Sequence, residues 1–461
     1  MSDKEERIER LSHANMWGLL AQFSWPALVS MTLSALYNVI DRFYIGQGCG
    51  MDAIAGLALT FPVMMLFAAF GIWIGVGSGA LLSIKLGEND RVAAEKVLGQ
   101  CVALKIAIGL VLPPLFFLFL DPVLRWTGGA SVSPQAITYA KQYLRIVLFF
   151  QLFSHLAFGL ANCIRSEGSP RQSMTCMIVG FGINLVLDPV FIFVFHWGVA
   201  GAAWATNIAM TCSCLWALLY YLRQQSVVRL RIRRIWFYPA LAARAFGIGL
   251  APFLQQFTGS VINFSMNYAF AKWAVDGERA TISIASFGIF QTVGMMCFMP
   301  MMGVQQGIGP IIGYNWGARN LPRVREAFLV GLKATTVGCF LAWAVQVFAS
   351  YPLARCFVNA GDQLLLQTAA HDMRVGSCML WLIGLNVICT TFYQSIGKPR
   401  VAILLSLLRQ GICLLPCVWF LPYLLDNHTL AIWLALPLSD TLCCLASIPV
   451  FLHEIKALRA S

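Results

Sequence analysis

Long apolar segments recur along the whole chain and are separated by short clusters of charged, glycine and proline residues. Each contains about 20 residues or more, enough for a helix to cross a hydrocarbon layer of ~30 Å. The breaks predict about twelve membrane-spanning helices, near 17–46, 53–84, 92–120, 136–162, 171–196, 199–223, 241–271, 281–313, 323–350, 371–395, 400–424 and 429–453. The predicted fold class is therefore an all-α polytopic membrane protein.

Two motifs occur twice, in the same order and at nearly the same offset. The stretch GVGSGALLSIKLGEND (75–90) aligns with QQGIGPIIGYNWGARN (305–320), and IRSEGSPRQ (164–172) aligns with YQSIGKPRV (393–401). Because each half contains an even number of spans, both copies enter the membrane from the same side. The sequence therefore predicts two parallel six-helix repeats, an arrangement common in secondary transporters.

The distribution of charge sets the orientation. Lys and Arg concentrate in the loops on the side of the N-terminus, which in a membrane protein is the cytoplasm. This bias explains the net charge of +12 without a nucleic-acid partner. The most basic stretch, RQQSVVRLRIRRIWFYP (223–239), indicates a cytoplasmic linker between the halves, for which attachment to anionic lipid is a second role.

These observations predict a multi-pass membrane protein with both termini in the cytoplasm. Its expected parts are a cytoplasmic N-terminal segment (1–16), an N-lobe (17–223), a basic linker (224–240), a C-lobe (241–453) and a cytoplasmic tail (454–461).

Composition gives no indication of a cofactor, a metal centre or an enzyme. The 15 cysteines lack paired CxxC spacings, and no two of the six histidines stand at ligand spacing. The chain contains no phosphate-binding loop, no HExxH and no G-x-S-x-G motif. We therefore expect no cofactor and no catalytic residue, and regard an intramembrane enzyme as the least favoured class.

The segment FGINLVLDPVFIFVFHW (181–197) carries two polar side chains inside an apolar span. Asn184 and Asp188 are four residues apart, so on a helix they face the same way. Pro189 follows and cannot donate a backbone hydrogen bond, which leaves carbonyl groups available as ligands. The pair therefore predicts a proton or Na⁺ site.

The aligned positions of the second half lack these groups. Carrying the alignment of the second motif forward places Cys413 opposite Asn184 and Cys417 opposite Asp188. A residue needed only for packing would tend to occur in both copies. The difference between the halves therefore favours a role in ion coupling.

The first span behaves in the same way: Asp41 aligns with Asn267. A charged aspartate near the bilayer centre costs about 2.5–3.5 kcal/mol, so it persists where protein, water or an ion compensates it. Because the second half lacks both acids at the aligned positions, we expect the buried acids to be confined to the first half and to share a cavity there. Burial and a second carboxylate favour the protonated form, whereas Na⁺ would hold the acids ionised, and the sequence leaves both open. In the alternative, Asp41 and Asp188 are wetted at the outer helix ends, with Asp41 paired to Arg42.

The chain resembles the multidrug and toxic compound extrusion (MATE) family, most closely its prokaryotic DinF-type and MepA-like branch. The resemblance is carried by FSWPALVSMTLSALYNVIDRFYIG (23–46), GVGSGALLSIKLGENDRVAA (75–94), IRSEGSPRQSM (164–174), INLVLDPVFIF (183–193) and GVAGAAWATNIA (198–209). It implies twelve helices in two six-helix lobes, and a location in a prokaryotic inner membrane. It also implies a cation or proton site in the N-lobe, formed by Asp41, Asn184, Asp188 and Thr206.

The resemblance further implies a large cavity between the lobes that holds amphipathic, often cationic substrates. Some relatives carry acids on the seventh and tenth spans, but the segments 252–264 and 379–393 contain none, which puts a C-lobe ion site in doubt. Methionine and neutral polar side chains suit a pocket for varied apolar ligands. The candidates for it are Met64, Gln255, Gln256, Asn267, Met295, Met299 and Asn386.

The predicted function is secondary active efflux of small molecules by antiport with H⁺ or Na⁺. The alternatives are a flippase for lipid-linked precursors, a transporter of the major facilitator type, and an exporter dedicated to one metabolite. The expected partners are a small-molecule substrate and membrane lipids, and the expected state is a monomer.

Overall fold

The computed structural model describes residues 9–126, 133–223, 225–274, 276–358 and 362–460. The predicted N-terminal segment, linker and tail therefore lie partly outside the described residues, at 1–8, 224 and 461.

The first half of the chain is built from long helices joined by short turns. They are α2 (Met16–Cys49), α3 (Met51–Gly87), α4 (Arg91–Leu118), α5 (Leu120–Trp126), α6 (Pro134–Phe149), α7 (Gln151–Ser166), α8 (Pro170–Pro189), the π-helical segment η2 (Val190–Val194) and α9 (Gly198–Leu222).

The second half repeats this pattern after a short 3₁₀ turn. Its elements are η3 (Ile232–Arg234), α10 (Pro239–Trp273), α11 (Gly277–Gly317), α12 (Leu321–Phe348), α13 (Ser350–Arg355), α14 (Gln363–Ser377), η4 (Leu380–Leu382), α15 (Ile383–Ser395), α16 (Pro399–Leu407), the π-helical η5 (Leu408–Leu414), α17 (Leu415–Phe420), η6 (Leu421–Tyr423) and α18 (His428–Ala460). The described residues contain no strand. The helix α18 also runs through most of the predicted cytoplasmic tail.

The helices confirm the predicted polytopic, all-α fold class. Among the described residues, ten helices are long and apolar enough to cross a membrane, or eleven if α6 and α7, which meet at 54°, form one bent span. The helix at the seventh predicted position, α10, is not among them, because polar residues in its middle such as Gln255, Asn263 and Asn267 lower its hydropathy. The predicted twelve is therefore close to the number of spans seen.

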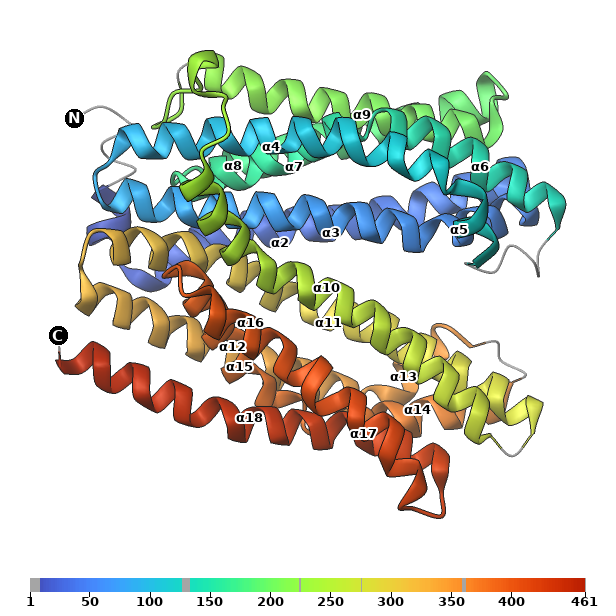
Figure 1. Cartoon of the computed structure of the whole chain (residues 1–461). Helices are drawn as coiled ribbons and strands as arrows, with labels where there is room; N and C mark the ends of the chain where they lie inside the picture. Colours follow the sequence, from blue (N-terminus) through green and yellow to red (C-terminus); the bar gives the residue numbers. More distant parts are fainter. Residues whose placement is uncertain (1–8, 127–132, 224, 275, 359–361, 461) are drawn as a thin grey trace. The chain divides into compact units, whose positions relative to one another are not determined.

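The chain divides into two compact units. The first contains Met1–Ala14, Trp25–Gly249 and Gly317–Arg319, and the second contains Asn15–Ser24, Leu250–Trp316 and Asn320–Ser461. The main division runs inside α10, at Gly249, and not through the basic linker. Figure 1 shows the helices α2 to α9 and α10 to α18 along the chain.

The two repeated motifs build the same local structure in both halves. At the start of α4 the side chain of Asp90 caps the N–H of Ala93, and at the start of α12 the side chain of Asn320 caps the N–H of Arg323. The residue before each of these caps has a positive φ, 57° and 55° respectively. The internal repeat read from the sequence is thus visible in the backbone.

A third local match lies ahead of α8 and α16. Gly168 and Gly397 have φ values of 92° and 74°, a region that side chains with a Cβ rarely adopt, and a proline then starts each helix at its first turn. The glycine and proline of both copies are therefore required by the turn itself.

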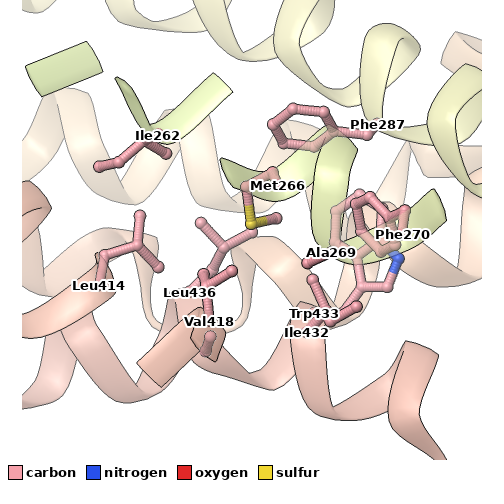
Figure 2. Packing of buried hydrophobic residues seen from close by; sticks show 11 residues of the cluster. Ile262, Met266, Ala269, Phe270, Phe287, Leu414, Val418, Ile432, Trp433 and Leu436 are labelled. Carbon is pink, nitrogen blue, oxygen red and sulfur yellow. The ribbon is translucent and has the colours of Figure 1, made fainter. Parts of the chain in front are cut away.

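Each unit has its own apolar core. In the second unit Phe270 of α10 and Phe287 of α11 pack against Trp433 of α18, which is fully buried (Figure 2). In the first unit a cluster around Ile45, Tyr143 and Val199 joins α2, α6 and α9. This second cluster lies next to the polar residues described below.

Candidate functional site

The helix α8 brings Asn184 and Asp188 together inside the first unit. Both side chains are buried, and Asn184 Nδ2 donates a hydrogen bond to Asp188 Oδ1 at 3.1 Å. The i, i+4 spacing read from the sequence therefore produces the contact expected of it. Asp188 is fully buried, so the alternative of an acid wetted at a helix end does not describe it.

Asp41 of α2 reaches the same place from a neighbouring helix. It is buried, and its carboxyl group lies close to the carboxyl group of Asp188. Its neighbour Arg42 is exposed and stands over the ring of Phe61, 5.6 Å from the centroid. Asp41 on α2 therefore lies beside Asp188 on α8.

Three oxygen atoms at this point have no hydrogen-bond partner among the described residues. They are Asp41 Oδ1, Asn184 Oδ1 and Asp188 Oδ2, and all three are buried. Carboxylates at this range repel each other unless a proton lies between them or a cation neutralises them. An oxygen-only donor set of this kind suits a proton or a hard monovalent cation.

The predicted ligand Thr206 of α9 is buried, and its hydroxyl lies 3.0 Å from the hydroxyl of Tyr37 on α2. Tyr143 of α6 also lies close to Thr206 and to both acids. Thr206 thus belongs to the polar cluster of the site, and the tyrosines connect it to α2 and α6.

The two tyrosines were missed in the sequence analysis. Tyr37 could have been found, because it precedes Asp41 by four residues and so shares its helix face. Tyr143 stands in the ordinary amphipathic pattern of α6 and carries no such signal. Its place in the site depends on tertiary packing alone.

The backbone changes type directly after the acid of α8. The α-helix ends at Pro189, and the next five residues, Val190–Val194, are π-helical, closed by a bond from Phe195 N to Val190 O of 3.0 Å. Pro189 has no N–H for the regular ladder, which explains the change. π-Helical turns of this kind are frequent at functional sites.

The predicted substrate-cavity residues are distributed over both units. Asn386 is buried in helix packing, where its Nδ2 donates to Leu405 O and Ser447 Oγ at 3.2 and 3.3 Å. Met64 lies in the first unit, half-buried against two apolar clusters. The remaining candidates belong to α10 and α11, where Gln255, Asn267 and Met295 are exposed and Gln256 and Met299 are half-buried.

The expectation that buried acids occur only in the first half is wrong. In the second unit Asp440 of α18 is buried and accepts a bond of 2.7 Å from Arg409 Nε of η5. Asp372 of α14 is also buried and accepts a bond of 2.7 Å from Ser286 Oγ. Asp372 lies in the predicted tenth span, ahead of the segment 379–393, and Asp440 lies in the predicted twelfth span. Asp440 differs from the pair in the first unit because it forms an ion pair, although its Oδ2 has no hydrogen-bond partner among the described residues.

A polytopic helical fold with two repeats and buried carboxyl groups is that of a membrane transporter. The family can be stated as well: the MatE family model matches residues 26–190 and 243–419. The chain belongs to this family, and the resemblance to MATE transporters is confirmed.

Individual relatives extend over nearly the whole chain. The multidrug export protein MepA of Staphylococcus aureus (strain MRSA252) is 27% identical over 450 residues, covering 96% of this chain and 95% of that protein. A crystal structure of MATE in the bent conformation superposes with a TM-score of 0.90 at 21% identity and covers 98% of both chains. An outward-facing multidrug resistance MATE transporter of the MOP superfamily gives 0.88, also at 21% identity and 98% of both chains. At this identity the structural matches show the fold alone.

Proposed function

We propose that this protein exports amphipathic, often cationic small molecules by antiport with H⁺ or Na⁺, and that Asp41, Asn184 and Asp188 bind the coupling ion. Export of small molecules is supported by membership of the MATE family and by the similarity to the multidrug export protein MepA. Ion coupling is supported by one observation above all: two buried carboxyl groups lie close together, with unpartnered oxygens around them and no cationic partner among the described residues.

Either H⁺ or Na⁺ stabilises the site relative to its empty state. With the site empty and both acids ionised, Asp41 and Asp188 repel each other in a medium of low dielectric. A shared proton replaces this repulsion with a hydrogen bond, and Na⁺ coordinated by the same oxygens would neutralise it. Either ion therefore draws α2 towards α8.

A movement of α2 transmits ion binding to the substrate site. The helix is 34 residues long and contains Pro26, whose missing N–H weakens the ladder and permits bending. Ion binding and substrate binding favour different positions of this helix, so each ligand lowers the affinity for the other by the same factor. Release of substrate outwards is then driven by entry of the ion.

The proposal is tested by transport in proteoliposomes under separately imposed pH and Na⁺ gradients. We expect Asp41→Asn and Asp188→Asn to lower gradient-driven transport by about tenfold or more, because a coupling free energy of 1–3 kcal/mol is lost. The gradient that drives the wild type identifies the ion.

The matched control is Asp121→Asn. Asp121 is an exposed acid of the same unit, paired with Lys141 at 2.6 Å, and we expect its amide variant to transport normally. Normal gradient-driven transport by both site variants at equal protein content would overturn the proposed site.

We propose that the protein works as a monomer in a prokaryotic inner membrane, with both termini on the cytoplasmic side. The distribution of basic loops supports this orientation.

A further inference from the structure

The segment between α9 and α10 is docked on the first unit and presents one unusual surface. We propose that this surface binds the headgroups of anionic phospholipids at the cytoplasmic face of the membrane. We call it the linker face and define it by Arg229, Ile232, Arg233, Trp236 and Phe237. The proposal does not depend on the transport mechanism.

The segment is held in place by a buried carboxylate of α4. Glu95 is 8% exposed and receives ion pairs from Arg234 Nη1 and from Arg231 Nε, the latter at 3.2 Å. At Gly99, one turn further along α4, an added Cβ would collide with the carbonyl oxygen of Arg234. The linker therefore lies directly against α4, as Figure 1 shows for the stretch between α9 and α10.

A second buried carboxylate fixes the start of the segment. Glu167 is fully buried, and its Oε2 accepts a hydrogen bond from Val228 N at 3.3 Å. Ser226 is also fully buried and donates to Val228 O at 2.6 Å. Towards the other end, Lys96 stands over the ring of Tyr238 at 5.6 Å. These contacts hold the segment in one conformation, so a ligand that binds it does not have to pay the conformational entropy of ordering it.

Docking leaves the apolar side chains of the segment outside. Ile232 is 87% exposed, Trp236 70% and Phe237 51%. Three large apolar side chains close together in sequence are costly to leave in water. Arg229 and Arg233 are exposed beside them. The linker face therefore combines apolar groups with positive charge.

The electrostatics of the region are one-sided. No acidic residue occurs in the sequence between Asp188 and Asp276, and the charge of Glu95 is matched by Arg231 and Arg234. The charges of Arg229 and Arg233 are therefore left for an anionic partner.

The position along the helices selects lipid as that partner. Glu95 lies in the second turn of α4, which begins at Arg91, and the span Gly198–Leu222 ends just before the segment. The linker face is thus at the ends of the membrane spans, at the depth of the headgroups. Tryptophan, phenylalanine and arginine are the residues that favour this depth, where rings enter the acyl boundary and guanidinium groups bind phosphate.

The experiment measures lipid binding to the intact, detergent-purified protein by native mass spectrometry. The probes are dioleoyl phosphatidylglycerol, dioleoyl phosphatidylcholine and glycerol phosphate. We expect preferential binding of phosphatidylglycerol. The double variant Arg229→Gln/Arg233→Gln should weaken it about 25-fold, since each arginine near an anionic surface contributes about fivefold, and should leave phosphatidylcholine unaffected.

The matched control neutralises two exposed arginines at the opposite ends of the spans, Arg279→Gln/Arg355→Gln, and should bind phosphatidylglycerol as the wild type does. Ile232→Ser/Trp236→Ser should weaken binding of phosphatidylglycerol with the charges intact. Melting temperatures verify that each variant is folded, and in the wild type added salt should weaken phosphatidylglycerol binding.

Three results would overturn the proposal. The first is wild-type affinity for phosphatidylglycerol in the Arg229/Arg233 variant. The second is an equal loss in the Arg279/Arg355 control, which would show a general effect of charge. The third is displacement of the lipid by glycerol phosphate at equal concentration, which would reveal a site for free phosphate and not for a lipid surface.

Discussion

At the scale of single residues, the polar cluster of the first unit differs from those of the second in its charge balance. Asp440 forms an ion pair with Arg409, although its Oδ2 is unpartnered, and Asp372 accepts a hydrogen bond from Ser286. Asp41 and Asp188 lie close to each other, each has an unpartnered oxygen, and neither forms an ion pair among the described residues. Buried charges in membrane proteins are usually paired, so two neighbouring carboxyl groups without a cationic partner are a candidate ligand site. This contrast, more than the presence of acids, separates a candidate ion site from structural polar contacts.

The hydroxyl contact between Tyr37 and Thr206 leads to a prediction for variants. Tyr37→Phe and Thr206→Ala should each lower the melting temperature, because a buried hydrogen bond contributes about 1 kcal/mol. Since both remove the same contact, the double variant should be less destabilised than the sum of the two. Melting curves in detergent measure this.

Tyr44→Phe is the control for the tyrosine variant. Tyr44 lies on the same helix and packs edge-on against Phe193 at 6.0 Å between ring centroids. Its phenylalanine variant should melt as the wild type does. Strict additivity of Tyr37→Phe and Thr206→Ala would contradict the shared contact.

The candidate site was partly predictable from sequence. Asn184 and Asp188 share a helix face, so periodicity alone brings them together, and the comparison of repeats singled out Asp41. The proximity of Asp41 to Asp188 is a tertiary contact that local spacing does not encode. The same limit explains why Tyr143 was missed and why Asn386, which looked like a pocket residue, is engaged in helix packing.

At the scale of elements, the two halves use the same turns but different helix interiors. The turns before α8 and α16 match in backbone geometry, whereas the π-helical segments fall at different points, Val190–Val194 and Leu408–Leu414. Turn geometry depends on a few glycine and proline residues, which are easily read from sequence. The placement of a π-helical turn depends on local packing and was not predicted, although Pro189 indicated a weakened ladder.

Because the two turns have the same backbone geometry, replacing the glycine should destabilise the protein in both. Gly168→Ala and Gly397→Ala place a Cβ at a positive φ, which costs about 1–2 kcal/mol at each position. Both variants should therefore melt at lower temperature than the wild type. The control, Gly182→Ala in α8, has open space around the added Cβ and should be neutral or slightly stabilising. Equal melting temperatures for all three variants would refute the requirement for glycine at these turns.

At the scale of the whole molecule, the sequence predicted the fold class and the internal repeat, because apolar runs of membrane length and repeated glycine motifs are strong signals. The division into two units was harder to predict from the sequence. Each unit takes parts of α2, α10 and α11, so the division follows packing inside continuous helices and not the loops that composition reveals. The docking of the linker on Glu95 and Glu167 could not be predicted either, because the sequence of an arginine-rich loop does not show which buried carboxylates it contacts.

The central claim is that ion and substrate exclude each other through the carboxyl pair of the first unit. Its most direct test is the equilibrium affinity for an amphipathic cation such as ethidium, measured with and without a saturating coupling ion in the purified wild type and in Asp188→Asn. We predict that the ion weakens ethidium binding to the wild type by about 5- to 150-fold and leaves the affinity of the variant unchanged. An affinity in the wild type that does not respond to either H⁺ or Na⁺, or an equal response in Asp188→Asn, would contradict the account.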